Sequence, residues 1–332
     1  MNNILIIYDK NNNGKTGKKI FEDYHKKYKD CILNFNNSER IYFKNINLIN
    51  NFLFHKKEKI IIKYFNIVIF NYGEDCSLSK DYLKKTIPIY NFIKNNYTHI
   101  SIFNNPLNHN LITDKFITYK KLKNCKYVKI PDFGVTKKKN LVNIKKFPII
   151  ISRRKQSGGI GKYKINSKDE LQKLDDNFIK NKFWATFYYS YLPNTNIFIC
   201  IRLFIFNNKL VDFICRPSLD WNVHTGNQIL NNKELIIKAD KFFHDYQNNN
   251  NKYIQHILDE LFNILGNGLY THDFILVNNK LILCELGYKV LDPKLIKVHT
   301  DYDLLKDLSN KICNNPDKVH NVYKQLLLNY KK

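Results

Sequence analysis

The chain has 332 residues, 44% of them hydrophobic and 25% charged, with a formal net charge of +25; this apolar content excludes disorder throughout, and the length predicts two or three domains. The charge favours anionic partners, nucleic acid among them. The lysines are spread along the whole chain, however, so a coding bias toward Lys, Asn, Ile, Tyr and Phe explains the charge better than a nucleic-acid surface does. The seven cysteines have no zinc-ligand spacing and no apolar run reaches the ~20 residues of a membrane span, which predicts a cytoplasmic protein with reduced thiols and no membrane partner.

Strands and helices alternate in the first hundred residues. The predicted strands are 4–8, 31–35, 67–70 and 99–103. Helices are predicted at 16–27 and at 82–94, where Pro88 should kink or split the second one. Such alternation is typical of a parallel sheet covered by helices on both faces. We therefore expect a Rossmann-like domain over residues 1–105.

A short glycine motif, Gly14-Lys15-Thr16, follows the first predicted strand and begins a helix, which is the context of a phosphate-binding P-loop. The P-loop pattern requires a glycine five residues before Gly14, and the chain has Asp9 there. An acidic residue at this point would lie close to the phosphates. We therefore interpret the motif as a helix start or a substrate loop.

Asn105-Pro106 signals a boundary, and a second unit is expected after it. Its predicted elements are a helix at 114–123, a strand at 149–152, a basic glycine-rich turn at 153–161 and a return strand at 162–165. Ser167 and Glu170 have the spacing of a capping box, which predicts another helix start.

The last third of the chain is rich in aromatic and β-branched residues. An antiparallel meander is predicted from strands 183–192, 197–206 and 209–215. A helix at 253–265 should end at Gly266. Residues 270–277 and 280–285 should form a hairpin, and a helix at 319–327 should close the chain.

Four segments supply, in one order along the chain, what phosphoryl transfer from ATP requires. They are Asp114-Lys115, the strand at 149–152 with its glycine loop, the strands that carry Arg202 and Arg216, and the hairpin that carries Asp273 and Glu285. Transfer needs cations on the phosphates, a mobile glycine cover, an adenine slot and carboxylates for Mg²⁺. Glu285 ends a strongly apolar strand, so its carboxylate is expected to have a specific partner.

Together these segments resemble the ATP-grasp superfamily over about residues 105–295, especially glutathione synthetase and the ribosomal-protein glutamate ligases. The resemblance implies an α/β and α+β fold, with a Rossmann-like pre-ATP-grasp domain over 1–105, a central lobe over 106–185 and a C-terminal lobe over 186–332. It further implies an ATP-dependent ligase that joins a carboxylate, through an acyl phosphate, to the amine of an amino acid, a peptide or a similar small acceptor. ATP and Mg²⁺ are the implied cofactors.

The resemblance also assigns roles to residues of this sequence. The residues implied to contact the ATP phosphates are Lys115 and Arg153. The residues implied to form the mobile lid are Ser157, Gly158, Gly159 and Gly161. The segment implied to contact adenine is Tyr189, Ser190, Tyr191 and Leu192. The implied catalytic residues are Arg202, Arg216 and Asn222, and the implied Mg²⁺ ligands are Asp273 and Glu285.

Three departures from the family pattern bear on these roles. Ser152 stands where the family usually has a second ATP-binding lysine, and Arg153 beside it is the expected substitute. Cys200 replaces an acidic residue two positions before Arg202. Gly287 replaces the Asn of the metal-binding Glu-x-Asn, which leaves open whether one or two Mg²⁺ ions bind.

Two other functions stay open from the sequence. One keeps the fold but phosphorylates a hydroxyl, as in an ATP-grasp small-molecule kinase. The other is a non-catalytic protein that binds nucleotide or nucleic acid, which the net charge of +25 motivates. We rank both below the ligase because the two carboxylates and both arginines are present. A homodimer is compatible with the resemblance, and the substrates cannot be read from the sequence.

Overall fold

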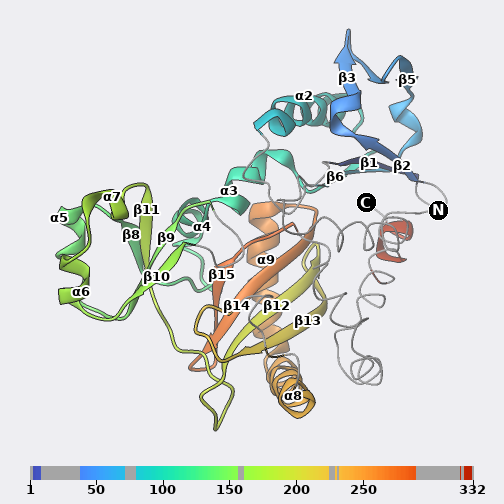
Figure 1. The fold of residues 1–332 in the computed structure, drawn as a ribbon. Coiled ribbons are helices and arrows are strands. Elements are labelled where there is room, and N and C mark those ends of the chain that lie inside the picture. The colour runs from blue at the N-terminus through green and yellow to red at the C-terminus, as the bar shows by residue number, and fades with distance from the viewer. Residues whose placement is uncertain are drawn as a thin grey trace.

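The computed structural model of the chain describes residues 3–8, 38–71, 80–155, 161–223, 229, 232–288, 322 and 325–330. Over these residues the fold is mixed α/β, with a parallel N-terminal sheet, a small three-stranded sheet, a central sheet and a C-terminal sheet (Figure 1). None of the helices within the described ranges is both long and apolar enough to cross a membrane.

The N-terminal sheet has the strand order β2-β1-β6-β7, and all its neighbours are parallel. Its strands are β1 (Ile4–Tyr8), β2 (Ser38–Tyr42), β6 (Ile67–Asn71) and β7 (Ser101–Phe103). Three of the four predicted strands are thus confirmed, and β2 was missed. The strand predicted at 31–35, the helix at 16–27 and the motif Gly14-Lys15-Thr16 lie outside the described residues. Because of that gap, the Rossmann-like topology stays a prediction.

Helix α2 (Lys80–Asn96) contains Pro88 and is one continuous helix, so Pro88 does not split it; the alternative, a kink at Pro88, stays a prediction. Ile89 and Ile93 of its second half are buried in the main hydrophobic core. Burial of this apolar face stabilises the helix beyond the proline.

A small antiparallel sheet between β2 and β6 was not predicted. Its strands are β3 (Ile46–Ile49), β4 (Phe52–His55) and β5 (Glu58–Ile60), and short 3₁₀ turns flank it at Phe43–Asn45 and Ile62–Tyr64. Asn50 and Asn51 have φ values of 47° and 62°, as a tight type I′ hairpin turn requires. The Asn50-Asn51 pair was therefore the feature of the sequence from which this hairpin could have been predicted.

The central sheet has the order β10-β9-β11-β8 and is antiparallel throughout. Its strands are β8 (Phe133–Val135), β9 (Ile149–Arg153), β10 (Lys162–Ile165) and β11 (Lys182–Thr186). One face packs on α5 (Lys138–Leu141), α6 (Lys168–Gln172) and α7 (Asp176–Ile179). The other face packs on α4 (Lys115–Leu122), which follows a short 3₁₀ turn (Pro106–Asn108) and α3 (His109–Thr113). Ser167 caps α6 as predicted.

The C-terminal sheet has the order β13-β12-β14-β15. Its strands are β12 (Phe198–Phe206), β13 (Lys209–Ser218), β14 (Leu269–Val277) and β15 (Lys280–Glu285). The predicted meander was therefore wrong in its first strand, because β11 pairs within the central sheet. Helices α8 (Lys233–Asn249) and α9 (Asn251–Leu265) lie on one face of the sheet (Figure 1). Helix α9 ends at Gly266, whose φ of 75° suits glycine.

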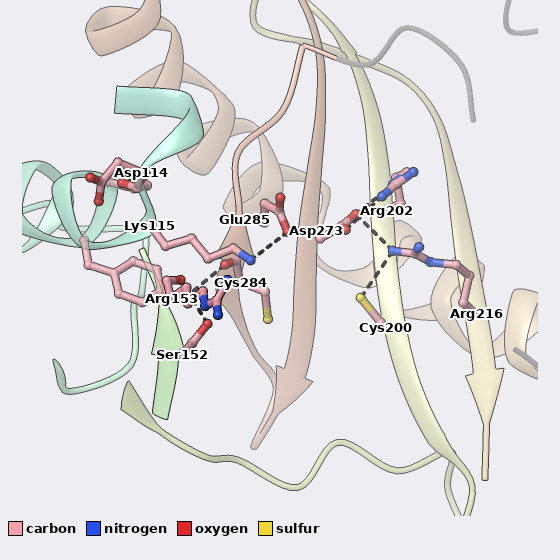
Figure 2. Close-up of polar contacts among 12 residues, drawn as sticks. Asp114, Lys115, Ser152, Arg153, Cys200, Arg202, Arg216, Asp273, Cys284 and Glu285 are labelled. Carbon is pink, nitrogen blue, oxygen red and sulfur yellow. Dashed lines mark hydrogen bonds and ion pairs between the residues drawn. The ribbon is translucent and has the colours of Figure 1, made fainter. Parts of the chain in front are cut away.

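The opposite face of the C-terminal sheet is divided into two parts. At one end, Phe204, Phe206 and Leu269 pack with Ile6 and Ile69 of the N-terminal sheet. Further along, the same face carries charged side chains in place of apolar ones. The N-terminal sheet thus covers one end of this face and leaves the charged end toward α4 and the central lobe (Figures 1 and 2).

Candidate active site

Three charged residues form a row across the C-terminal sheet. Arg202 of β12 is directly opposite Asp273 of β14, and Asp273 is directly opposite Glu285 of β15. Directly opposite residues of neighbouring strands share one face of a sheet, so the three side chains project to the same side. Figure 2 shows this row with Arg216 beside it.

A β-bulge sets the position of Glu285. Phe274 pairs with Leu283, whereas the preceding residue, Asp273, pairs with Glu285. Cys284 is therefore the extra residue on β15. A bulge changes which side chain faces a given partner. Here it brings a carboxylate, instead of the Cys284 thiol, opposite Asp273.

Two buried arginines hold Asp273. Arg202 donates from Nε to Oδ1 at 2.8 Å and from Nη2 to Oδ2 at 2.9 Å, and Arg216 Nη2 lies 3.0 Å from Oδ1. Burial alone would raise the pKa of Asp273, but the two guanidinium groups hold the pKa well below its usual range. The carboxylate is therefore ionised at physiological pH. Arg216 also donates to Cys200 Sγ at 3.5 Å, at the position where an acidic residue was expected.

Lys115 reaches this row from α4, the helix that packs on the central sheet. It is the first residue of α4, whose N-cap is Asp114; the Asp114 side chain accepts from the backbone amides of Phe116 and Ile117. Lys115 Nζ lies 3.2 Å from Glu285 Oε2 (Figure 2). Tyr119 of the same helix donates to the Cys284 carbonyl at 3.0 Å. Helix α4 therefore contacts both the central sheet and the C-terminal sheet, at the end of β15.

A second lysine of the central lobe, Lys162, was not singled out by the sequence analysis. It pairs in register with Ser152, which is itself opposite Phe183. Burial and the Lys115 ammonium lower the pKa of Lys162, while Glu285 opposes that shift. The available signal was the predicted antiparallel pairing of 149–152 with 162–165, which places Lys162 beside Ser152.

The structure describes Arg153 but only part of the glycine loop that follows it. Arg153 is exposed and pairs in register with Lys182, and its charge adds to burial in lowering the pKa of Lys182. Gly161 has a φ of 69°, in the left-handed region that favours glycine. Ser157, Gly158 and Gly159 lie outside the described residues, so the lid stays a prediction.

The segment predicted to contact adenine connects β11 to β12. Ser190 is buried, and its hydroxyl donates to the Leu276 carbonyl at 3.0 Å, which anchors the segment to β14. Leu192 is buried as well. Tyr189 and Tyr191 are 46% and 38% exposed and stack on each other with ring centroids 5.7 Å apart. Their rings therefore form an open aromatic surface beside the joint of the two lobes.

Asn222 lies in the loop after β13. Its backbone amide donates to Asp220 Oδ1 at 3.0 Å, and the preceding Trp221 packs edge-on against Phe187, 5.6 Å between ring centroids. These contacts place the loop beside the start of the Tyr189 segment. A catalytic role for Asn222 stays a prediction.

The donor set suits a magnesium ion that is shared with a ligand. Among the described residues, no group of three or more His, Cys, Asp or Glu side chains is arranged to hold a metal alone. Mg²⁺ commonly uses one or two carboxylates together with substrate phosphates, and Asp273 and Glu285 face each other in register. The Glu285 side chain is 31% exposed and that of Asp273 only 15%, so Glu285 is the more accessible of the two carboxylates.

No protein-family model matches the chain, and no curated protein is similar to it in sequence. Similar solved structures include the ATP-grasp ligase PsnB complexed with minimal precursor, at 8% identity and a TM-score of 0.51, covering 98% of this chain and 99% of that one. They also include a D-alanine–D-alanine ligase from Bacillus anthracis complexed with ATP, at 12% identity and a TM-score of 0.50, covering 96% and 98%. A RimK domain ATP-grasp protein from Sphaerobacter thermophilus has 9% identity and a TM-score of 0.47, covering 96% and 98%. The chain therefore has an ATP-grasp fold, which confirms the resemblance found in its sequence.

Proposed function

We propose that the chain is an ATP-dependent ligase that joins a carboxylate to the amine of an amino acid, a peptide or a similar small acceptor. One observation carries this proposal: Lys115 from the central lobe and two buried arginines from the C-terminal lobe converge on a facing pair of carboxylates. Cations and metal-binding carboxylates in one place are what a polyphosphate requires. The fold supports the proposal, because solved ligases of this fold were captured with ATP and with a precursor.

Each part of the site has a role in this proposal. Lys115 binds the ATP phosphates, and residues 157–161 cover them. The backbone of residues 189–192 contacts adenine, and Asn222 lies on the substrate side. Arg202 and Arg216 stabilise the negative charge that develops on the transferred phosphoryl group and on the acyl oxygen, because preorganised cations in a buried site act strongly on such charge.

The proposed reaction has two steps. A carboxylate oxygen of the first substrate attacks the γ-phosphorus, the bond to the β–γ bridging oxygen breaks, and ADP leaves. The amine nitrogen of the second substrate then attacks the acyl carbon, the carbon–oxygen bond to phosphate breaks, and inorganic phosphate leaves as the nitrogen loses a proton. The protein's main contribution is to position the reactants and exclude water.

Magnesium is part of the proposal. Held by Glu285 and Asp273 together with the phosphates, Mg²⁺ would neutralise the charge of the polyphosphate. Glu285 would exchange its contact with Lys115 for the metal, which leaves the Lys115 ammonium available to a phosphate oxygen. We further propose that the protein acts in the cytoplasm and that its substrates are small molecules or peptides.

Calorimetric titration of ADP, with and without Mg²⁺, tests the nucleotide site. We expect Mg²⁺-dependent binding that Glu285→Ala weakens by about tenfold or more, because a charged contact in a half-buried site is lost. Asp245→Ala is the matched control, since Asp245 is an exposed carboxylate that pairs with Lys241 four residues earlier on α8. Absence of ADP binding to the wild-type chain at physiological Mg²⁺ would overturn the proposal.

A second assay separates the ligase from a kinase. Amino acids and short peptides are screened in pairs for ADP release, and the products are weighed by mass spectrometry. The ligase requires both a carboxylate and an amine, and its product has lost one water relative to the two substrates. A stable phosphorylated product that forms without an amine would show a kinase instead.

A further inference from the structure

The position of Lys162 follows from three residues that are in register. Lys162, Ser152 and Phe183 lie on neighbouring strands β10, β9 and β11, each directly opposite the next, so they share one face of the central sheet. Phe183 packs on the rings of Phe116 and Tyr119, with centroids 6.1 and 5.9 Å apart. This face is therefore the one that looks toward α4, where Lys115 reaches Glu285.

Lys162 lacks a fixed anionic partner. The residue is half-buried, and its side-chain ammonium makes no hydrogen bond or ion pair with the residues that the structure describes. Burial and the Lys115 ammonium lower its pKa, whereas Glu285, Cys284 and Cys200 raise it. The groups that act on its charge thus come from α4, β15 and β12, which surround the joint of the two lobes.

The charges at this joint do not balance. The cations are Lys115, Lys162, Arg202 and Arg216, and the anions are Asp273 and Glu285. Counted over these described residues alone, four positive charges face two negative ones, and burying a cation without a counter-charge is costly. A ligand with several negative charges would remove the imbalance.

We propose that Lys162 is a second phosphate-binding lysine of the nucleotide site, supplied by β10 from the position directly opposite Ser152. The inference rests on the proposed function and names one more residue for the same site. It assigns the role to Lys162 in preference to Arg153, the substitute expected from the sequence.

The neighbouring cations are less suited to this role. Arg153 is exposed, and its charge acts on Lys182, which lies 4.8 and 3.4 Å over the rings of Tyr163 and Phe178. Lys164 shares a face with Lys162 but is engaged elsewhere, because it donates to the Tyr189 hydroxyl at 3.3 Å. Lys162, by contrast, has a charge on which both the Lys115 ammonium and the Glu285 carboxylate act.

The test compares the binding of ADP and of adenosine in the presence of Mg²⁺. We expect Lys162→Met to weaken ADP by about 10- to 100-fold and adenosine by less than about threefold, because only ADP has phosphates for the ammonium to bind. Lys162→Arg should restore most of the ADP affinity. Lys173→Met is the matched control. Lys173 is an exposed lysine that follows α6, and its loss should change the affinity for neither ADP nor adenosine.

A labelling experiment on the wild-type chain removes any dependence on how the variants fold. Lysines are acetylated with acetic anhydride with and without Mg·ADP, and each site is quantified by mass spectrometry. We expect ADP, but not adenosine, to protect Lys162, while Lys173 reacts equally in all samples.

The outcomes separate this inference from the proposed function. If the wild-type chain binds no ADP, the proposed function fails and the role of Lys162 fails with it. Suppose that ADP binds, that Lys162→Met has the wild-type ADP affinity and that ADP does not protect Lys162 from acetylation. Then only the role of Lys162 is overturned. Loss of ADP affinity in Arg153→Met, together with unchanged binding in Lys162→Met, would assign the role to Arg153.

Discussion

Asp273 holds two buried arginines together. Its carboxylate accepts from both Arg202 and Arg216, and it is kept ionised by them. We expect Asp273→Asn to lower the free energy of unfolding by about 3–5 kcal/mol, because a neutral amide leaves two buried cations without their counter-charge. Urea denaturation at pH 7 measures the change.

Asp245→Asn is the control for this loss. Asp245 pairs with Lys241 at 2.9 Å, and both side chains are more than half exposed. Exposed pairs four residues apart on a helix contribute little, so the control should change stability by less than about 0.5 kcal/mol. An equally small effect of Asp273→Asn would mean that other groups balance the charge of the arginines.

His272 should make stability depend on pH. It is buried beside Tyr270, its Nδ1 accepts from the Gly287 amide at 3.4 Å, and burial lowers its pKa to about 4. The unfolded chain binds a proton near pH 6.5, so unfolding becomes more favourable as pH falls from 6.5 to about 4. The loss should total about 3 kcal/mol.

Urea denaturation between pH 4 and 7 tests this dependence. His272→Asn keeps an acceptor for the Gly287 amide but cannot titrate, so we expect it to remove most of the slope. His244→Asn changes an exposed histidine and should leave the slope as it is. Asp273 contributes little over most of this window, because the pKa of its carboxyl is near 3.8 in the unfolded chain and lower still in the folded one. A slope that persists in His272→Asn would contradict the assignment.

The sequence predicted which residues belong to the site better than it predicted which side chains contact each other. Lys115, Asp273 and Glu285 were selected by residue type and order, and the structure brings them together with both arginines. Lys162 was missed because its position depends on strand register, which a one-residue shift would reverse. The pairing of Glu285 with Asp273 also depends on the bulge at Cys284, for which the sequence has no marker.

At the scale of elements, helix α4 is fixed at its start by Asp114. The Asp114 side chain caps the helix and also pairs with Arg154 at 2.9 Å. We expect Asp114→Ala to cost about 1–2 kcal/mol, since the cap and the ion pair are both lost. Asp114→Asn keeps the cap and should cost less than about 1 kcal/mol, because the Arg154 side chain is 42% exposed.

Thermal and urea unfolding of the two variants measure these costs, and ADP titration adds a second measurement. Because the cap sets the direction of the first turn, Asp114→Ala should also weaken ADP binding through Lys115, whereas Asp114→Asn should leave it nearly unchanged. Equal losses in the two variants would indicate that the ion pair, and not the cap, holds the start of α4.

Elements with a local signal were predicted well, and elements that depend on distant pairing were not. Helix α9 has its apolar spacing and its stop at Gly266, and the hairpin of β14 and β15 has its Asn278-Asn279 turn. Strand β11 looked like part of the later meander because its residues have the same character. Its partners β9 and β8 lie about 30 and 50 residues earlier in the chain, beyond the reach of local patterns.

At the scale of the whole molecule, the positive charge has two sources with different effects on binding: the dispersed surface lysines and the cations of the site. The net charge of +25 is spread over the chain, whereas the cations of the site are few and mostly buried. Dispersed surface charge attracts any polyanion and is strongly screened by salt. Buried cations next to a specific ligand are screened much less.

Salt dependence therefore distinguishes general charge from a built nucleotide site. We expect any binding of a single-stranded oligonucleotide to fall steeply, by about 10³-fold or more, between 50 and 200 mM salt. Mg·ADP binding should fall by less than about tenfold over the same range, because its contacts lie at the joint of the two lobes. Fluorescence anisotropy with a labelled oligonucleotide and calorimetry with ADP measure the two curves. Oligonucleotide binding that persists at 200 mM salt in a chain that does not bind Mg·ADP would favour a nucleic-acid-binding protein built on the ATP-grasp fold.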